Sequence, residues 1–152
     1  MQRIMPCLWF DKEAEEAAKF YTSIVRNSKI LTTARYGKAA AEVSGQPEDS
    51  VMTVTFELDG YEFMALNGGP MFTFSPATSF MIHCQTQEEI DELWAKLSEG
   101  GAEEQCGWLK DRYGVSWQIV PALLDEIAQQ DDPEAWERAM KAMLPMKKLD
   151  LE

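Results

Sequence analysis

The sequence predicts an α+β fold built from a duplicated unit of one strand, one helix and further strands. Apolar residues recur at helical spacing over residues 12–25 and 87–99, and a short apolar, strand-like run precedes each of these segments. Aligning the ends of the two runs, Phe10 and Cys84, gives an offset of 84 − 10 = 74 residues, about half of the 152 in the chain. The two halves therefore indicate a pseudo-twofold duplication, which a helical tail follows over residues 122–152.

The first unit covers about residues 3–68. Residues 3–10 form an apolar strand in which Pro6 predicts an edge or irregular position, and Asp11 is a candidate N-cap for the helix that follows. Strands are expected over residues 28–36, 51–58 and 61–67. Between the first two of them residues 37–50, rich in Ala, Gly and Ser, are interpreted as a loop. The pair Asp59-Gly60 predicts a tight hairpin between the last two strands.

The second unit covers about residues 78–121. A strand over residues 79–84 leads into a helix that Thr86 and Glu89 begin with a capping box. A short strand and a hairpin over residues 106–121 close the unit, with the bend at Gly114. In the tail, residues 122–130 are weakly helical. A second helix is expected to begin at Asp132-Pro133 and to run to about residue 144.

Composition restricts the environment and the partners. The chain has 14 basic and 26 acidic residues, and a net charge of −12 argues against nucleic acid and anionic membranes as partners. No segment approaches the roughly 20 apolar residues of a membrane-spanning helix. Three cysteines without a CxxC pair fit a reducing cytoplasm better than a disulfide framework. We therefore expect a single cytoplasmic domain over residues 1–152.

Alternation along the predicted strands collects hydrogen-bonding side chains on one face of the sheet. Such a face, apolar with scattered polar groups, is typical of small-molecule pockets, although an ordinary sheet face that meets water or a second subunit has the same pattern. The predicted members are Cys7, Trp9, Thr53, Thr55, Phe63, Ala65, Asn67, Ser79, Met81, His83, Ser116 and Gln118. The opposite face, with Phe56 and Trp117 among its residues, is apolar and suited to packing under the helices.

Several of these residues have a functional and a structural interpretation. His83, the only histidine, fits a base or ligand that titrates near neutrality, but a lone histidine on a strand is more often structural. Asn67 precedes two glycines, which either let backbone amides approach a ligand or form a plain turn. Trp9 and Trp108 fit either stacking on a flat ligand or sheet packing, and Asp111 is expected in a solvated charge pair. The predicted ligand-binding residues are Trp9, Thr55, Asn67, Ser79, His83, Trp108 and Gln118.

A family likeness is carried by four stretches: AEEAAKFY, VMTVTFELDGYEFMALNGGP, CQTQEEIDELWAKLSEGG and CGWLKDRYGVSWQIVP. Together they resemble the PhnB-like branch of the vicinal oxygen chelate superfamily, which also contains glyoxalase I, bleomycin-resistance proteins and extradiol dioxygenases. Members of this branch often carry the name 3-demethylubiquinone-9 3-methyltransferase. The likeness extends from residue 4 to about residue 149. It implies two βαβββ modules whose strands curve into a cup, usually completed by a second subunit in a homodimer.

The resemblance also implies where a metal would bind. In the metal-dependent members four ligands, mostly His, Glu and Gln, face the cup from the first and last strand of each module. In this chain those places fall at about Met5, Ala65, Ser79 and Gln118. Only Gln118 is a usable oxygen ligand, and an amide is a weak ligand beside a carboxylate. We therefore expect no cofactor and no metal centre of the usual kind, with a divalent metal as the less favoured alternative.

The methyltransferase name has no support in the residues. A nucleotide-type methyl donor usually sits at a Gly-rich turn between a strand and a helix of a parallel sheet. The two strand-to-helix turns of this chain, FDKEAE and CQTQEE, contain no glycine. We interpret the name as a family label.

Three classes of function stay open at this level. The favoured one is a protein that binds a small molecule in the cup without the usual metal, because three ligand places have lost their donors while a polar and aromatic face is retained. The second is a metal-dependent lyase, isomerase or dioxygenase that uses His83, Gln118 and a carboxylate such as Glu57 or Glu62. The third is an interaction module in which the C-terminal helix matters most. No particular reaction is indicated.

Overall fold

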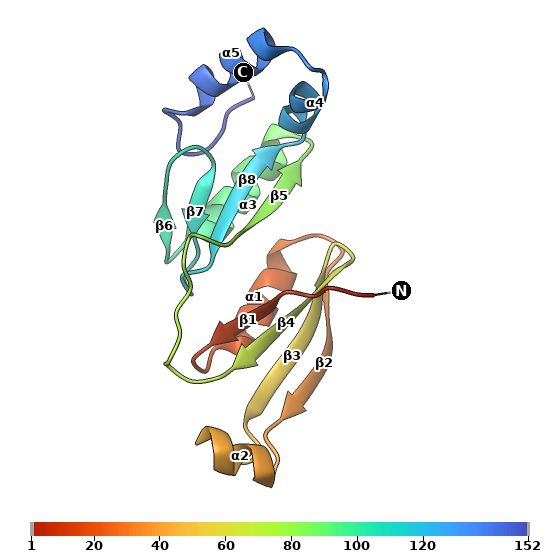
Figure 1. Cartoon of the computed structure of the whole chain (residues 1–152), viewed down its shortest axis with the longest axis vertical. Helices are drawn as coiled ribbons and strands as arrows, with labels where there is room; N and C mark the ends of the chain where they lie inside the picture. Colours follow the sequence, from red (N-terminus) through yellow and green to blue (C-terminus); the bar gives the residue numbers. More distant parts are fainter. Residues whose placement is uncertain (1, 152) are drawn as a thin grey trace. The chain divides into compact units, whose positions relative to one another are not determined.

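The computed structural model describes residues 2–151 and contains two compact units, which meet in the sequence between Thr73 and Phe74 (Figure 1). We call them module one and module two. Module one contains β1 (Cys7–Phe10), α1 (Ala14–Ile24), β2 (Lys29–Arg35), α2 (Lys38–Ser44), β3 (Val51–Leu58) and β4 (Tyr61–Asn67). Module two contains β5 (Ser79–Cys84), α3 (Gln87–Ser98), β6 (Ala102–Glu103), β7 (Trp108–Lys110), β8 (Ser116–Pro121), α4 (Leu123–Gln129) and α5 (Pro133–Met143).

The two modules have the same sheet topology. Module one has the strand order β1-β4-β3-β2 and module two the order β5-β8-β7-β6. In each sheet the first strand pairs in parallel with the last, and the other neighbours pair antiparallel. This confirms the predicted α+β fold of two βαβββ modules with added C-terminal helices. The strand expected over residues 3–10 begins only at Cys7, directly after Pro6, and β1 lies at the edge of its sheet. Both agree with an edge or irregular position at this proline.

The core of module one lies between α1 and its sheet. Ala14, Ala17, Ala18 and Tyr21 recur every three or four residues along α1, and all four are fully buried. The three alanines let the helix lie close to the strands, and Tyr21 stacks on Phe56 of β3 with the ring centroids 6.2 Å apart. The apolar stripe of α1 is thus what covers one face of the sheet.

The start of α1 is capped from a distant strand, so the prediction of Asp11 as its N-cap is wrong. No side chain next to the helix caps it, and its N-cap position is Glu13. Instead the Asn67 side chain, at the end of β4, accepts the Ala14 N–H through Oδ1 at 2.8 Å and donates through Nδ2 to the Val51 carbonyl at 3.1 Å. One amide therefore holds the helix and two strands together, and sequence proximity could not reveal it.

The strand β4 presents the face opposite to the one predicted for it. Phe63, Ala65 and Asn67 were expected on the polar face, but they share the α1 side of the sheet with Phe56 and Phe10, their partners across the strands. The reason is the two-residue turn at Asp59-Gly60, which sets Leu58 opposite Tyr61 and hence Phe56 opposite Phe63. The non-helix face of β4 therefore carries Met64 and Leu66.

Residues 37–50 are not the simple loop that was expected. The segment contains α2, which ends at Gly45 in the left-handed conformation with φ +76°. Three consecutive alanines favour a helix, and a glycine in this conformation is a common helix stop. The composition of the segment therefore predicted a loop where the chain forms a short helix with a glycine C-cap.

Module two buries the stripe of α3 against β7 and β8. The Thr86 hydroxyl accepts the Glu89 N–H at 3.2 Å, as the capping box predicted. From the helix Ile90, Trp94 and Leu97 are buried, and from the strands Leu109, Trp117 and Ile119 are buried. Trp117 and Ile119 are thus buried as predicted, and on the other face of β8 Ser116 and Val120 are buried as well.

Asp111 is not the solvated carboxylate that was expected. It is only 2% exposed, and one of its oxygens accepts the N–H groups of Tyr113 and Val115. The other oxygen accepts the Trp117 indole N–H at 2.8 Å. The carboxylate therefore organises the turn between β7 and β8 and joins it to the core.

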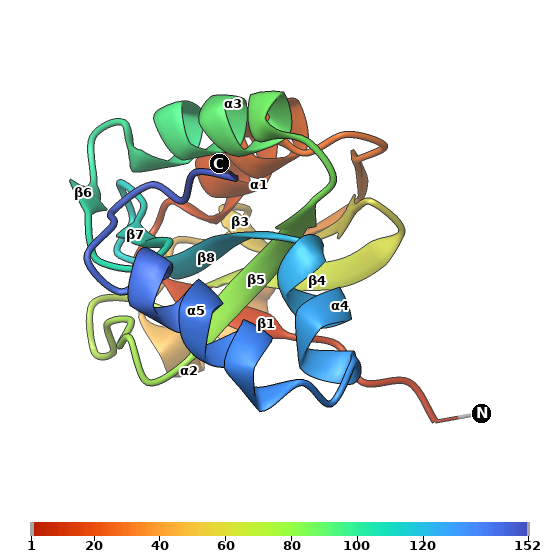
Figure 2. The ribbon, with the colours of Figure 1, turned by 90° about the horizontal axis from the view of Figure 1, so that it is seen from above.

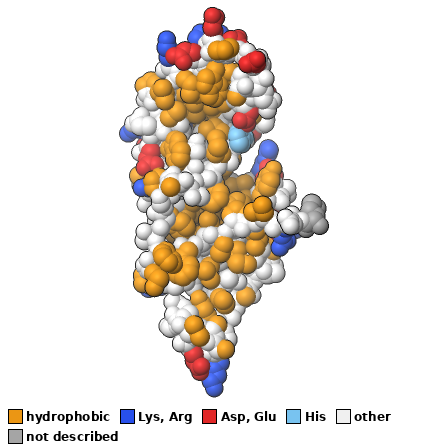
Figure 3. All heavy atoms as spheres, viewed as in Figure 1, with side chains coloured by type: hydrophobic (Ala, Val, Ile, Leu, Met, Phe, Trp, Pro, Cys, Tyr) orange, Lys and Arg blue, Asp and Glu red, His pale blue; other side chains and the backbone are white. Residues whose placement is uncertain are grey.

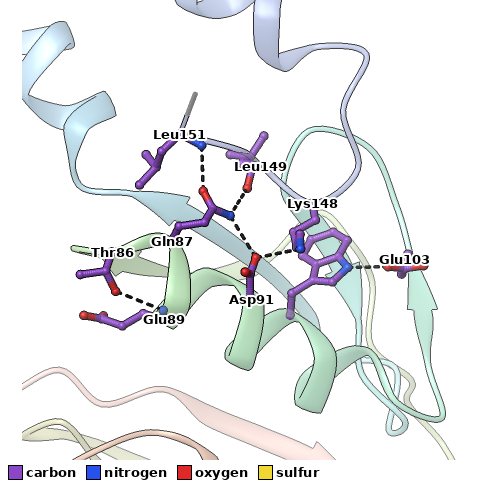
Figure 4. Close-up of polar contacts among 9 residues, drawn as sticks. Thr86, Gln87, Glu89, Asp91, Glu103, Lys148, Leu149 and Leu151 are labelled. Carbon is purple, nitrogen blue, oxygen red and sulfur yellow. Dashed lines mark hydrogen bonds and ion pairs between the residues drawn. The ribbon is translucent and has the colours of Figure 1, made fainter.

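The tail returns to module two after α5. There the side chain of Gln87 donates to the Leu149 carbonyl and accepts the Leu151 N–H, and Lys148 pairs with Asp91 at 2.7 Å (Figure 4). The hydrogen bonds from Lys148 and then Gln87 lower the pKa of Asp91. Within residues 2–151 no helix is long and apolar enough to cross a membrane.

We predict that Asn67→Ala lowers the free energy of unfolding by about 2 kcal/mol, because the buried Ala14 N–H and the Val51 carbonyl each lose a partner. Urea unfolding monitored by circular dichroism measures the change. The control is Gln129→Ala, which removes an exposed side-chain amide at the end of α4. Equal destabilisation by the two variants would contradict the capping role of Asn67.

Candidate functional site

The face of the module two sheet that points away from α3 carries the candidate site. The strand registers arrange its side chains in rows that run across β5, β8 and β7. The first row is Ser79, Ser116 and Lys110, the second is Met81, Gln118 and Trp108, and the third is His83 and Val120. Side chains that oppose each other on paired strands are close enough to act on one ligand.

The first two rows are linked by one hydrogen bond. Gln118 Nε2 donates to Ser79 Oγ at 2.9 Å, so the amide bridges from its own row to the next. A serine hydroxyl that accepts one bond still has its own proton to donate, and the Gln118 carbonyl oxygen is a further acceptor. This pair therefore offers a ligand a donor and an acceptor side by side.

Ser116 lies between Ser79 and Lys110 and is 1% exposed. Within residues 2–151 its hydroxyl has no hydrogen-bond partner. A buried hydroxyl without a partner costs free energy, so it is uncommon in a folded protein unless something else satisfies it. Beside it Lys110 is half-buried and, in the part of the chain that the structure describes, forms no ion pair.

His83, in the third row, is joined to the tail. Its Nε2 lies 3.1 Å from Asp125 Oδ2 of α4, and both side chains are partly exposed. Figure 2 shows α3 on one side of β5 and β8 and the tail helices α4 and α5 on the other side. The tail therefore borders the His83 end of the candidate face, and the histidine is already engaged by a carboxylate.

The other predicted residues lie in module one. Trp9 is half-buried and donates from Nε1 to the Gly69 carbonyl at 2.9 Å. Its ring packs against the Phe72 ring in an edge-to-face arrangement, with the ring centroids 5.0 Å apart. Thr55 is half-buried opposite Met64 on the face that α1 does not cover. Both the oxygen and the nitrogen of the Asn67 side-chain amide are hydrogen-bonded to the backbone, and the residue is only 7% exposed. The structure thus brings together Ser79, His83, Trp108 and Gln118, and it does not bring Asn67 to that face.

The residues at the four places of the superfamily metal do not fit a divalent ion. Met5 offers no oxygen or nitrogen side-chain donor, and neither does Ala65, which lies on the α1 side, or its neighbours Met64 and Leu66 on the other face. Ser79 and Gln118 offer a hydroxyl and an amide that already bond to each other. Hard cations prefer carboxylates, and transition metals prefer imidazole or thiolate. Within residues 2–151 no group of three or more His, Cys, Asp or Glu side chains could hold a metal ion.

The carboxylates considered for a non-standard metal site lie elsewhere. Glu57 and Glu62 oppose each other across β3 and β4 of module one. Glu62 pairs with Arg3 at 2.6 Å. Neither is on the module two face that holds Gln118.

Two residues of the site were missed as ligand candidates. Lys110 is two positions after Trp108, so strand alternation alone puts the two side chains on the same face. Ser116 was placed on the correct face, but only the structure shows that its hydroxyl is buried without a partner. The alternation that identifies Lys110 can be seen in the sequence, but the missing partner of Ser116 cannot.

Comparison with known proteins now shows the family. A family model described as 3-demethylubiquinone-9 3-methyltransferase matches residues 2–120. The chain belongs to this family. A solved structure of a PhnB protein from Bacillus cereus is 39% identical, and the match covers 80% of this chain and 100% of that one with a TM-score of 0.70. The protein is thus PhnB-like, as its motifs predicted.

More distant structures share the fold of this PhnB-like protein. Protein PA1353 from Pseudomonas aeruginosa is 20% identical over 80% of this chain and 98% of its own, with a TM-score of 0.65. The fosfomycin resistance protein FosX from Listeria monocytogenes is 12% identical over 83% of this chain and 95% of its own, with a TM-score of 0.57. No curated protein matches the chain. The family match ends at residue 120, so α4 and α5 lie outside it.

We predict that Ser116→Ala raises the free energy of unfolding by about 1 kcal/mol, because it removes a buried hydroxyl that has no partner. For a chain of this length such a gain raises the melting temperature by roughly 3 °C. Differential scanning calorimetry without added ligand measures it. Ser44→Ala is the control, since Ser44 is exposed at the end of α2 and its hydroxyl accepts the Gln46 N–H at 3.2 Å, so this variant should not gain stability from removal of an unsatisfied group. A lower melting temperature for Ser116→Ala would show that the hydroxyl has a partner in the native protein.

Proposed function

We propose that this PhnB-like protein binds a small organic molecule on the row-patterned face of module two, without the usual metal centre of its superfamily. The observation that carries the proposal is the buried Ser116 hydroxyl, which has no partner within residues 2–151. It lies beside Lys110 and Ser79 in the strand registers. A ligand oxygen at this point gives the hydroxyl the partner that the described chain does not provide.

The composition of the face supports the same proposal. It combines two hydroxyls, an amide and an ammonium group with the apolar surfaces of Met81 and Trp108. Small-molecule sites typically combine apolar walls with a few polar groups that orient the ligand. The donor set, a hydroxyl and an amide at the places that would hold a metal, favours direct hydrogen bonding to the ligand.

We further propose that the protein is a cytoplasmic homodimer. The dimer is supported by the family resemblance, in which a second subunit usually completes the cup. The cytoplasm is supported by the cysteines, since Cys7, Cys84 and Cys106 are all thiols and none forms a disulfide within residues 2–151.

A fragment screen followed by NMR tests the binding proposal. We expect fragment hits to shift the NMR signals of the backbone amides of β5, β7 and β8. Gln118→Ala should weaken the affinity of these fragments about fivefold, because they lose one hydrogen bond worth about 1 kcal/mol. The control Gln129→Ala changes an exposed glutamine on α4 and should leave the affinities unchanged. Hits that shift none of these strands would contradict the proposed site.

Metal analysis of the same purified protein tests the other half of the proposal. We expect far less than one divalent ion per chain by mass spectrometry, and no rise of the melting temperature on adding divalent ions. A stoichiometric ion that Gln118→Ala releases would overturn the metal-free proposal.

Sedimentation velocity tests the oligomeric state. We expect a species with twice the mass of one chain at micromolar concentration. A monomer that persists across the accessible concentration range would contradict the dimer.

A further inference from the structure

The polar and apolar groups of the candidate face are segregated by row. The first row holds only polar side chains, Ser79, Ser116 and Lys110. The second row places the Gln118 amide between Met81 and Trp108. Because the rows are two residues apart along the strands, about 6.6 Å separates them. One end of the face is therefore cationic and rich in hydroxyls, and the adjoining part is apolar.

The first row has the chemistry of an anion site. Lys110 supplies a positive charge, and within residues 2–151 it has no carboxylate as an ion-pair partner. The Ser116 hydroxyl is buried and has no acceptor there. Ser79 accepts its bond from Gln118 and keeps its own proton for another acceptor. The two hydroxyls and the ammonium group of this row are therefore three hydrogen-bond donors, one of them positively charged. Such a set suits the two oxygens of a carboxylate, because charge-assisted hydrogen bonds are the strongest.

The second row has the chemistry of a flat apolar body. Met81 is 50% exposed, and Trp108 is half-buried on the other side of β8. A thioether and an indole both make favourable contacts with an aromatic ring. Gln118 lies between them with its carbonyl oxygen available to a ligand donor.

We propose that the ligand of this face is an organic carboxylate with a planar, apolar body about one ring long. The carboxylate binds the row of Ser79, Ser116 and Lys110, and the ring lies over Gln118 between Met81 and Trp108. This assignment rests on the proposed function and adds the chemical class of the ligand to it. His83 takes no part, because Asp125 engages it at the far end of the face.

Benzoate and its neutral isostere benzamide test the assignment as a matched pair of probes. Each is titrated into the full-length protein and followed by amide NMR shifts of β5, β7 and β8. For a ligand of this size we expect benzoate to bind with a Kd on the order of 1 mM. We expect benzamide to bind about tenfold more weakly, the usual worth of a charge-assisted hydrogen bond.

Two variants attribute the difference to the first row. Lys110→Met keeps most of the length of the side chain and removes its charge, so it should lower benzoate affinity to that of benzamide and leave benzamide unchanged. The control Lys96→Met removes a charge from α3, where Lys96 pairs with Glu92, and should change neither affinity. Ser116→Ala should weaken benzoate about fivefold while the unliganded protein melts at a higher temperature. A merely structural role of Ser116 would move stability and binding in the same direction.

The remaining outcomes overturn the assignment in separable ways. Equal affinity for benzoate and benzamide, or a benzoate site that Lys110→Met leaves intact, rejects the carboxylate and leaves small-molecule binding on this face standing. The carboxylate assignment is rejected in the same way if benzoate shifts only the NMR signals of amides near other lysines. If neither probe nor any library fragment shifts β5, β7 or β8, both the assignment and the proposed function fail.

Discussion

Strand β8 lies between β5 and β7, and each of its faces has a different environment. Trp117 and Ile119 are buried on the α3 side, and the residues between them must therefore point to the other side. A slip of one residue would bury the Gln118 amide under α3 and move the Trp117 indole to the other face, at a cost of several kcal/mol. The order of the rows on the candidate face follows from this register. The functional side chains are thus positioned by the apolar residues that alternate with them.

Two buried polar side chains of this protein, Asn67 and Asp111, bond to the backbone, and the buried Ser116 hydroxyl does not. Asn67 caps α1 from the end of β4, and Asp111 holds the turn between β7 and β8 while accepting the Trp117 indole N–H. Both are polar residues whose buried atoms have partners, as the cost of desolvation requires. Ser116 differs because its buried hydroxyl has no partner within residues 2–151. That contrast separates a ligand candidate from two structural residues that look equally polar in the sequence.

Local signals and long-range contacts explain which predictions succeeded. Strands β3, β4 and β5 and the capping of α3 by Thr86 were predicted correctly, because alternation, turn residues and caps act over a few residues. Asp11 failed as a cap because Asn67, 53 positions after Ala14, supplied the hydrogen bond instead. The face of β4 was predicted wrongly. The sequence did contain the information, because a two-residue turn at Asp59-Gly60 pairs Phe56 with Phe63 and so determines which side chains of β4 share a face with Phe56.

The sequence by itself determined the fold class, the duplication, the family and the face on which Ser79, His83 and Gln118 lie, because these follow from periodicity and motif. It also placed Lys110 on the same face as Trp108, two residues away. Only the tertiary structure decided which polar groups are satisfied. The Asn67 amide, the Gln118 to Ser79 bond and the unpartnered Ser116 hydroxyl depend on which strands become neighbours. Strand pairing joins residues tens of positions apart, so no local pattern encodes it.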